Sequence, residues 1–138
     1  LLSVCTVPIE HLSFIWPQAR EFIEPAVARS GGRFEASDVL ALLLAGKARL
    51  WISWDADEKR VEAAIITEII EYPRLRELRI WLVGGRDRKA WFDEAETMIA
   101  QFARESSCTV MASGGRRGWL RVIGSEWRET GPTWERRL

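Results

Sequence analysis

The chain has 138 residues, a length typical of one globular domain, and its 20 basic and 20 acidic side chains give a formal net charge of zero. Because 47% of the residues are hydrophobic and 29% are charged, the composition excludes a disordered chain, a coiled coil and a disulfide-stabilised miniprotein. The zero net charge also argues against nucleic-acid binding through bulk positive charge. We therefore expect a single domain over residues 1–138, with no nucleic acid among its partners.

The N-terminal part predicts a strand and then a helical region with two prolines. Residues 2–7 read as a strand. The helical region covers residues 11–29 and contains Pro17 and Pro25. Proline is tolerated in the first helical turn but costs about 3 kcal/mol inside a helix. We therefore expect Pro17 to open a helix and Pro25 to kink or split it.

A second helix is predicted over residues 39–45. Ser37 is the expected N-cap, Asp38 in the first turn faces the helix dipole, and Gly46 is the expected C-terminal glycine.

Three strands are predicted next. They cover residues 47–54, 61–70 and 78–83, and the polar segment 55–59 connects the first two as a hairpin. Residues 61–70 are apolar on both faces of the strand. This pattern favours a central strand that is covered on both sides.

The second half begins with Gly84 and Gly85, which are expected to break the chain before the clearest helix, residues 88–104. A strand over residues 109–112 and a short helix over 118–123 follow, and residues 127–137 are expected to hold two short strands. One apolar stripe marks the main helix, and it consists of Trp91, Ala95, Met98 and Phe102, with Phe92 and Ile99 beside it.

The predicted order is therefore β-α-α-β-β-β-α-β-α-β-β. A three-strand meander followed by helix, strand and helix is an α+β arrangement. We expect a mixed, mostly antiparallel central sheet with helices on both faces.

Eight tryptophans, against one tyrosine, are the unusual count in the composition. Five lie in predicted helices and strands and are expected core anchors, namely Trp16, Trp51, Trp54, Trp81 and Trp91. Trp119, Trp127 and Trp134 lie near the C-terminus. These three are either buried or form an exposed aromatic patch for a partner.

Membrane and metal sites are not expected. No apolar run approaches the roughly 20 residues that span a bilayer, and no signal peptide is predicted. Cys5 and Cys108 lie far apart, without a CxxC spacing or a histidine cluster, so no metal is expected. Two buried, reduced thiols are the predicted state, and a single disulfide is the alternative. These features favour a cytoplasmic protein with no membrane partner.

The element order resembles the fold of the GNAT N-acetyltransferases over nearly the whole chain. Residues 78–91 look like the strand–loop–helix unit that holds the pyrophosphate of acetyl-CoA in that family. Residues 118–121, followed by Gly124 and Trp127, look like the family's late helix and the glycine–aromatic pair after it. The chain also resembles small GNAT-like proteins encoded by bacteriophages and prophages, and it does so at three segments, residues 15–17, 50–51 and 116–119.

The resemblance implies an acetyl-CoA site in the loop that leads into the main helix. Its residues are Val83, Gly84, Gly85, Arg86, Asp87, Arg88 and Lys89. The N–H groups and dipole of a helix N-terminus suit a phosphate, and glycine lets the backbone come close. Three cations at a helix start oppose the dipole, and a bound anion would resolve that conflict. The alternative is a solvated turn whose arginines pair with nearby acids such as Asp87.

Two departures from the GNAT pattern concern donor binding and catalysis. Counted from Arg86, the family's loop has small residues where this chain has Lys89 and Trp91, and Trp91 is bulky enough to fill the space of a pantetheine chain. Active members also carry a tyrosine in the late helix that protonates the leaving thiolate. Here the only tyrosine is Tyr72, far upstream, and Leu120 stands near the expected place.

Amide-forming acyl transfer needs a base that deprotonates an amine, and Glu68 is the candidate. It lies inside an apolar strand, where burial would raise its pKa. The alternative is a strand-end glutamate that points outward or pairs with an arginine.

Two function hypotheses follow. The first is acyl-CoA-dependent N-acyl transfer, with acetyl-CoA as cofactor and a small-molecule or peptide amine as acceptor. The second is a catalytically inactive GNAT-like phage or prophage protein, a structural, assembly or interaction module that binds a phage or host protein or forms a homo-oligomer. A virion-associated location would accompany the second hypothesis.

Overall fold

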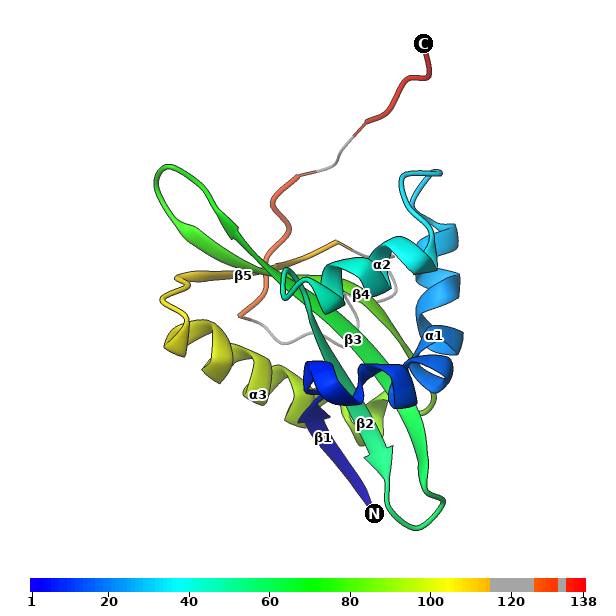
Figure 1. Cartoon of the computed structure of the whole chain (residues 1–138). Helices are drawn as coiled ribbons and strands as arrows, with labels where there is room; N and C mark the ends of the chain where they lie inside the picture. The colour runs from blue at the N-terminus through cyan, green and yellow to red at the C-terminus, as the bar shows by residue number, and fades with distance from the viewer. Residues whose placement is uncertain (115–125, 132–133) are drawn as a thin grey trace.

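The computed structural model describes residues 1–114, 126–131 and 134–138, and it contains a five-stranded sheet with helices on both faces (Figure 1). The strands are β1 (Leu2–Thr6), β2 (Arg49–Asp55), β3 (Arg60–Glu71), β4 (Arg76–Gly85) and β5 (Val110–Ser113). The helices are α1 (Leu12–Ala28), α2 (Ala36–Leu44) and α3 (Phe92–Glu105), with short 3-10 helices η1 (Ile9–His11) and η2 (Arg88–Ala90).

The strands lie in sequence order, β1-β2-β3-β4-β5. All neighbours are antiparallel except β4 and β5, which are parallel. The predicted α+β class, with a mixed and mostly antiparallel sheet, is confirmed. In the part of the chain that the structure describes, no helix is long and apolar enough to cross a membrane.

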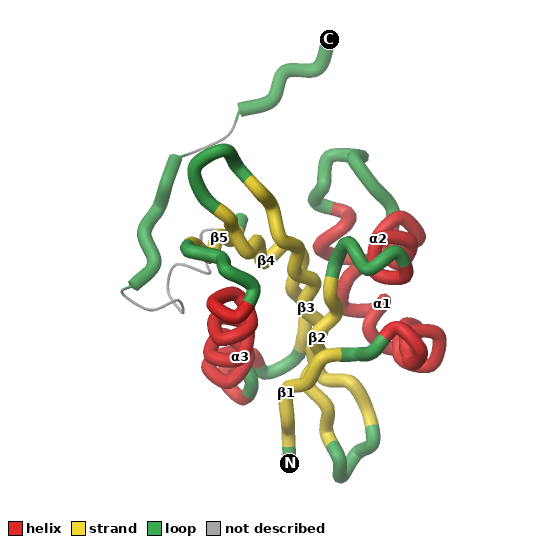
Figure 2. The backbone as a smooth tube through the Cα atoms, turned by 60° about the vertical axis from the view of Figure 1, so that its left-hand side comes forward, coloured by secondary structure: helices red, strands yellow, loops and turns green. Residues whose placement is uncertain are grey.

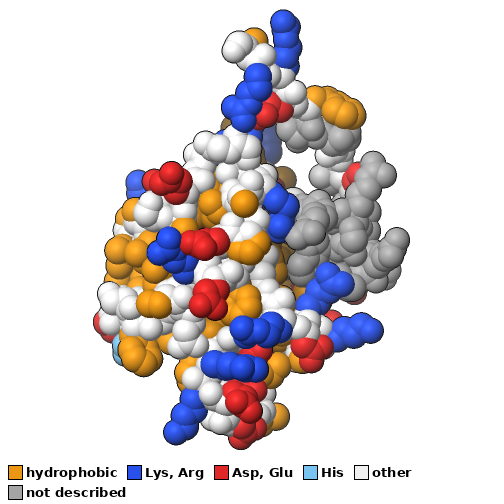
Figure 3. Space-filling model, turned by 90° about the vertical axis from the view of Figure 1, so that its right-hand side faces the viewer, with side chains coloured by type: hydrophobic (Ala, Val, Ile, Leu, Met, Phe, Trp, Pro, Cys, Tyr) orange, Lys and Arg blue, Asp and Glu red, His pale blue; other side chains and the backbone are white. Residues whose placement is uncertain are grey.

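Each face of the sheet has its own apolar core. Helices α1 and α2 cover one face and α3 covers the other (Figure 2). Along β3 the side chains alternate between the two cores: Ala64 and Ile66 pack under α1 and α2, whereas Ala63 and Ile65 pack under α3. This two-sided burial is what the continuous apolar run predicted. Acidic and basic side chains are interspersed on the surface around α1 (Figure 3), as the zero net charge suggests.

Helix α1 differs from the prediction at its prolines. Pro17 and Pro25 both lie inside the helix, so the first does not open it and the second does not split it. The axis changes direction after the first turns (Figure 1), as is usual for a helix that contains proline. Buried side chains on one face, among them Trp16 and Ile23, stabilise the helix against the sheet. This packing offsets the backbone hydrogen bonds that the prolines remove.

Helix α2 begins earlier than predicted. Its N-cap is Glu35 rather than Ser37, and the backbone N–H of Glu35 donates to the carboxylate of Asp38 at 2.8 Å. The structure therefore uses a reciprocal cap in which the acid sits on the third helical residue. Gly46 follows the helix with a φ of 72°, which confirms its predicted place.

The C-terminal elements are only partly open to comparison. The helix predicted over residues 118–123 lies outside the described residues. The two strands predicted within 127–137 are wrong for the described residues 126–131 and 134–138, none of which belongs to a strand.

The described part of the tail instead contacts two other elements. The indole N–H of Trp127 donates to the carboxylate of Glu96 on α3 at 3.1 Å. Further along, Glu135 forms an ion pair with Arg33 in the loop between α1 and α2. Trp134 is 86% exposed. The tail's polar groups therefore bind to side chains on the protein's surface instead of pairing with the sheet, and Trp134 adds nothing to the core.

The cysteine prediction is half right. Both thiols are free, and Cys108 is buried, but Cys5 is exposed. Val4 points into the core beneath α3. Its neighbour Cys5 therefore faces the other way on this edge strand.

Candidate active site

In the described chain, β4 pairs with β5 from Glu77 to Ile80, and β4 itself continues to Gly85. Trp81, the next residue, is an extra residue that bulges from β4 opposite β3. Bulges increase the local twist of a strand and re-aim its side chains. Residues 81–85 of β4 have no β5 partner in the described chain, and they lead to the predicted loop.

Gly84 and Gly85 were predicted to break the chain before the main helix, and this prediction is wrong, because both glycines are the last residues of β4. They pair with Ala64 and Ala63 of β3. A Cβ on Gly84 would overlap the carbonyl oxygen of Phe22 in α1 and lie 2.9 Å from its carbonyl carbon. Close packing of α1 on the sheet therefore requires a glycine at position 84, whether or not a ligand approaches.

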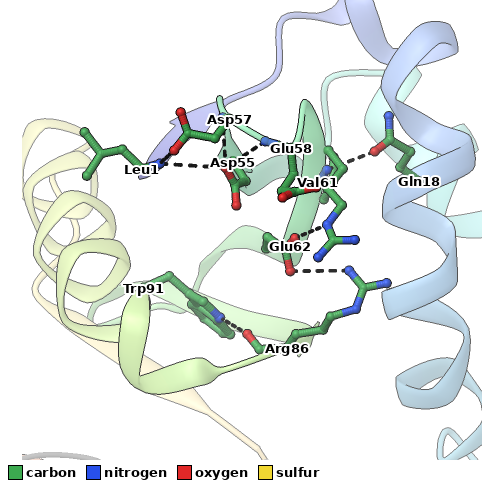
Figure 4. A network of polar contacts seen from close by, with 10 residues as sticks. Leu1, Gln18, Asp55, Asp57, Glu58, Val61, Glu62, Arg86 and Trp91 are labelled. Carbon is green, nitrogen blue, oxygen red and sulfur yellow. Dashed lines mark hydrogen bonds and ion pairs between the residues drawn. The ribbon is translucent and has the colours of Figure 1, made fainter.

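Arg86 points toward α1. Its guanidinium lies 5.0 Å from the centre of the Phe22 ring, and its Nη1 lies 3.4 Å from the carboxylate of Glu62 (Figure 4). The backbone N–H of Arg86 also donates to the carbonyl oxygen of Glu62 at 2.9 Å. Arg86 is therefore held on the face of α1, away from the α3 side where the rest of the loop continues.

The other loop residues lie between β4 and α3. Asp87 adopts the left-handed conformation with a φ of 42°, and Arg88 and Lys89 form η2. The first turn of α3 itself is acidic, with Asp93 and Glu94. The predicted conflict between cations and the dipole of the main helix is therefore absent, because the cations precede α3 and acids complement its N-terminus.

Trp91 closes the loop. Its side chain is only 2% exposed and packs in the core beneath α3. Its indole N–H donates to the carbonyl oxygen of Arg86 at 2.8 Å (Figure 4). The bulky side chain thus lies under the loop as part of the core.

Glu62 is a buried carboxylate beside the loop that the sequence reasoning did not single out. It is 7% exposed, and its carboxylate forms ion pairs with both Arg60 and Arg86 (Figure 4). The hydrogen bond from Arg60 to Glu62 raises the pKa of the Arg60 guanidinium above its ordinary value. The available signal was a glutamate inside an apolar strand, the same signal that singled out Glu68.

Glu62→Gln should lower the free energy of unfolding by about 1–2 kcal/mol. The change removes the charge that both guanidinium groups share, and the cost stays moderate because both arginines are half exposed and keep water. Urea denaturation measures this effect. The exposed Glu58→Gln is the control, and equal stability of the two variants would contradict a structural role for the buried carboxylate.

Glu68 pairs with Arg79. Its carboxylate lies 3.3 Å from Nη1 of that residue, which is also its register partner on β4. The ion-paired alternative for Glu68 is therefore what the structure contains. The pair lies next to Ile80, the last residue of β4 that has a β5 partner.

Glu68 also lines a cleft of about 700 Å³. The cleft lies between the end of β3, the chain that leads from α2 into β2, and the end of β1. Beside Glu68, the hydroxyl of Thr67 accepts a hydrogen bond from the buried indole of Trp51 at 2.9 Å. The predicted base and the predicted loop are thus at different positions along the sheet, on either side of the bulge at Trp81.

The catalytic tyrosine implied by the resemblance has no counterpart in the described residues. Tyr72 lies where the β3–β4 hairpin turns and is 44% exposed. The position of Leu120 lies outside the described residues. The described chain also brings together no group of three or more potential metal ligands.

The overall architecture is shared with solved acetyltransferases. An aminoglycoside acetyltransferase from an uncultured soil metagenomic sample, solved with sisomicin, superposes with a TM-score of 0.75 at 11% identity, over 99% of this chain and 96% of that chain. A ribosomal-protein-alanine N-acetyltransferase from Brucella melitensis gives 0.69 at 13% identity, over 100% and 99%. A GNAT family acetyltransferase from Staphylococcus aureus gives 0.66 at 8% identity, over 99% and 98%.

The chain has the GNAT acetyltransferase fold. No protein-family model matches the sequence, and neither does any curated protein. The GNAT fold predicted from the element order is thus confirmed by structure alone, at low sequence identity. These comparisons lend no support to the phage and prophage resemblance or to the interaction-module hypothesis.

Proposed function

We propose that this GNAT-fold protein is an acyl-CoA-dependent N-acyltransferase that transfers an acetyl group to an amine. The observation that carries the proposal is the bulge of β4 at Trp81, directly after Ile80, the last residue that pairs with β5 in the described chain, and shortly before the loop into α3. An acyl donor lying along β4 at this bulge would have its thioester near Ile80 and its phosphates near the loop. The solved acetyltransferases that share the architecture support the same reaction class.

In this proposal the loop residues have three roles. Val83, Gly84 and Gly85 supply the strand end along which the donor lies, and Asp87, Arg88 and Lys89 supply the turn next to its phosphates. Arg86 holds the loop to α1 through Glu62 and Phe22. The positive charge of Arg86 contributes to the electrostatic potential of the site, but its guanidinium does not contact the phosphates in this proposal.

Glu68 acts as the base in this proposal. The amine nitrogen bonds to the acyl carbon, the bond from that carbon to sulfur breaks with its electron pair on sulfur, and Glu68 takes the proton that the nitrogen loses. CoA leaves as the thiolate, which takes a proton from water. Glu68 is the register partner of Arg79, next to Ile80, and it lines the cleft through which an amine would enter. Acetyl-CoA supplies the acyl group as an activated thioester.

Acetyl-CoA should raise the melting temperature by several degrees, because a ligand that binds only the native state stabilises it. Differential scanning fluorimetry with increasing acetyl-CoA measures the shift. Lys89→Glu should weaken the effect, whereas Lys59→Glu, the same charge change on the β2–β3 turn, should leave it intact. No shift at millimolar acetyl-CoA would refute the proposed donor.

Glu68→Gln should lower kcat/KM for acetyl transfer by about 100-fold, in the range typical of a lost general base. The assay follows release of free CoA with a panel of amines. Arg79→Gln is the matched control, because it breaks the same ion pair and keeps the carboxylate. If both variants lose the same activity, the ion pair matters and Glu68 is not the base.

A further inference from the structure

The β3–β4 hairpin leaves part of β3 without a second neighbour. The last pair between β2 and β3 is Arg49 with Thr67, yet β3 continues to Glu71 (Figure 1). Strand backbone groups face their two neighbours alternately. Glu62 accepts from Arg86 on the β4 side, so Ile69 and Glu71 face the other side. In the described chain, no strand binds their backbone N–H and C=O groups there.

The space beside this edge is the cleft described above. The residues that lead into β2, from Gly46 to Arg49, line its opposite wall, so the two strands part and leave about 700 Å³ between them. Apolar side chains such as Leu12, Leu43 and Ile69 also line it. An open strand edge beside a partly apolar cleft is the geometry that binds an extended peptide as an added strand.

The charges of the cleft select the kind of peptide. Its acids are already neutralised, because Glu71 pairs with Arg76 at 2.9 Å and Glu68 pairs with Arg79 at 3.3 Å.

Two of its cations have no acidic partner in the described residues. Lys47 is exposed and unpaired there, and Arg49 lies over the ring of Phe102, at 4.3 Å. Arg76 pairs with Glu71, but its buried Nε has no acceptor among the same residues. The unmatched charge in the cleft is therefore positive.

We propose that the edge of β3 at Ile69–Glu71 binds an extended acidic peptide. The peptide's backbone pairs with Ile69 and Glu71, and its carboxylates lie against Lys47 and Arg49. The proposal does not depend on acyl transfer.

Fluorescence anisotropy with labelled peptides tests the proposal on the whole chain. A peptide of alternating valine and glutamate should bind, and the versions with glutamine or lysine in place of glutamate should bind at least about tenfold more weakly. Lys47→Glu should weaken binding of the acidic peptide to a similar extent. Lys59→Glu, an equal charge change at the opposite end of the sheet, should not.

Backbone pairing is tested separately by N-methylation of the acidic peptide on every second residue. An added strand presents only one set of its N–H groups to β3, so one of the two methylated forms should lose binding and the other should keep it. The proposal would be overturned if the two methylated peptides bound equally well. It would also be overturned if the peptides with glutamate, glutamine and lysine bound equally well. A dimer of the free protein in light scattering that Lys47→Glu dissociates would assign this edge to a second copy and overturn it as well.

Discussion

Replacing Trp91 by alanine should lower the free energy of unfolding by about 4 kcal/mol, the range measured for large aromatic residues in protein cores. Trp91 is 2% exposed and packs with the buried face of α3, including Ala95 and Ile99. Its indole N–H also holds the carbonyl oxygen of Arg86 at 2.8 Å. The substitution removes both the packing and the bond that closes the loop. Urea denaturation followed by circular dichroism measures the loss.

Trp134→Ala is the matched control for this prediction. The same side chain is deleted, but Trp134 is 86% exposed and the core loses nothing. We expect a change within about 0.5 kcal/mol, as is usual for surface substitutions. Similar losses in both variants would contradict the assignment of Trp91 to the core.

Gly84→Ala should destabilise the protein by about 3 kcal/mol, the upper range for overpacking a close contact. The new Cβ would overlap the carbonyl oxygen of Phe22. This oxygen belongs to the backbone of α1, so no side-chain rotation can relieve the overlap. Helix α1 would have to move off β4. The measurement is again urea denaturation, with the midpoint and the slope both recorded.

Gly114→Ala provides the comparison. A Cβ at position 114 would meet no atom of the described residues within 4 Å, so the stability should change little. The pair also separates two roles of Gly84. A Gly84→Ala variant with unchanged stability and lost acetyl-CoA binding would show that the glycine serves the ligand alone, and it would contradict the packing argument.

Local patterns were sufficient for the class of fold. The apolar run of β3 predicted a strand covered on both faces, because a strand that alternates between two cores has no polar face. The stripe on α3 predicted which side of that helix is buried, since its spacing follows the helical repeat. The order of these elements was enough to suggest the GNAT fold.

Local sequence patterns gave wrong predictions where the conformation of a residue depends on its contacts with a segment far away in the chain. Pro17 and Pro25 lie within α1 because the helix packs on the sheet, and that packing is not visible in residues 11–29. Gly84 reads as a chain break, yet it is in a strand beneath the backbone of α1.

The candidate site was predicted in part. Glu68 was singled out from its sequence context and the loop from the family resemblance, and the roles of both stay predictions. The ion pair with Arg79 and the direction of Arg86 toward Phe22 depend on strand register and helix placement. Glu62 has the same local context as Glu68, and only the folded chain brings Arg60 and Arg86 to it.

The sequence by itself determined the apolar patterns of the core strands and helices, the α+β order and the basic segment that follows two glycines, because these depend on periodicity and on the identity of neighbouring residues. Tertiary structure alone decided where β4 bulges, which glycine α1 touches, and which charges remain unmatched in the cleft beside β3. The physical reason is that each of these features depends on contacts between segments that are far apart in the chain. The free energy of such contacts cannot be read from a short stretch of sequence.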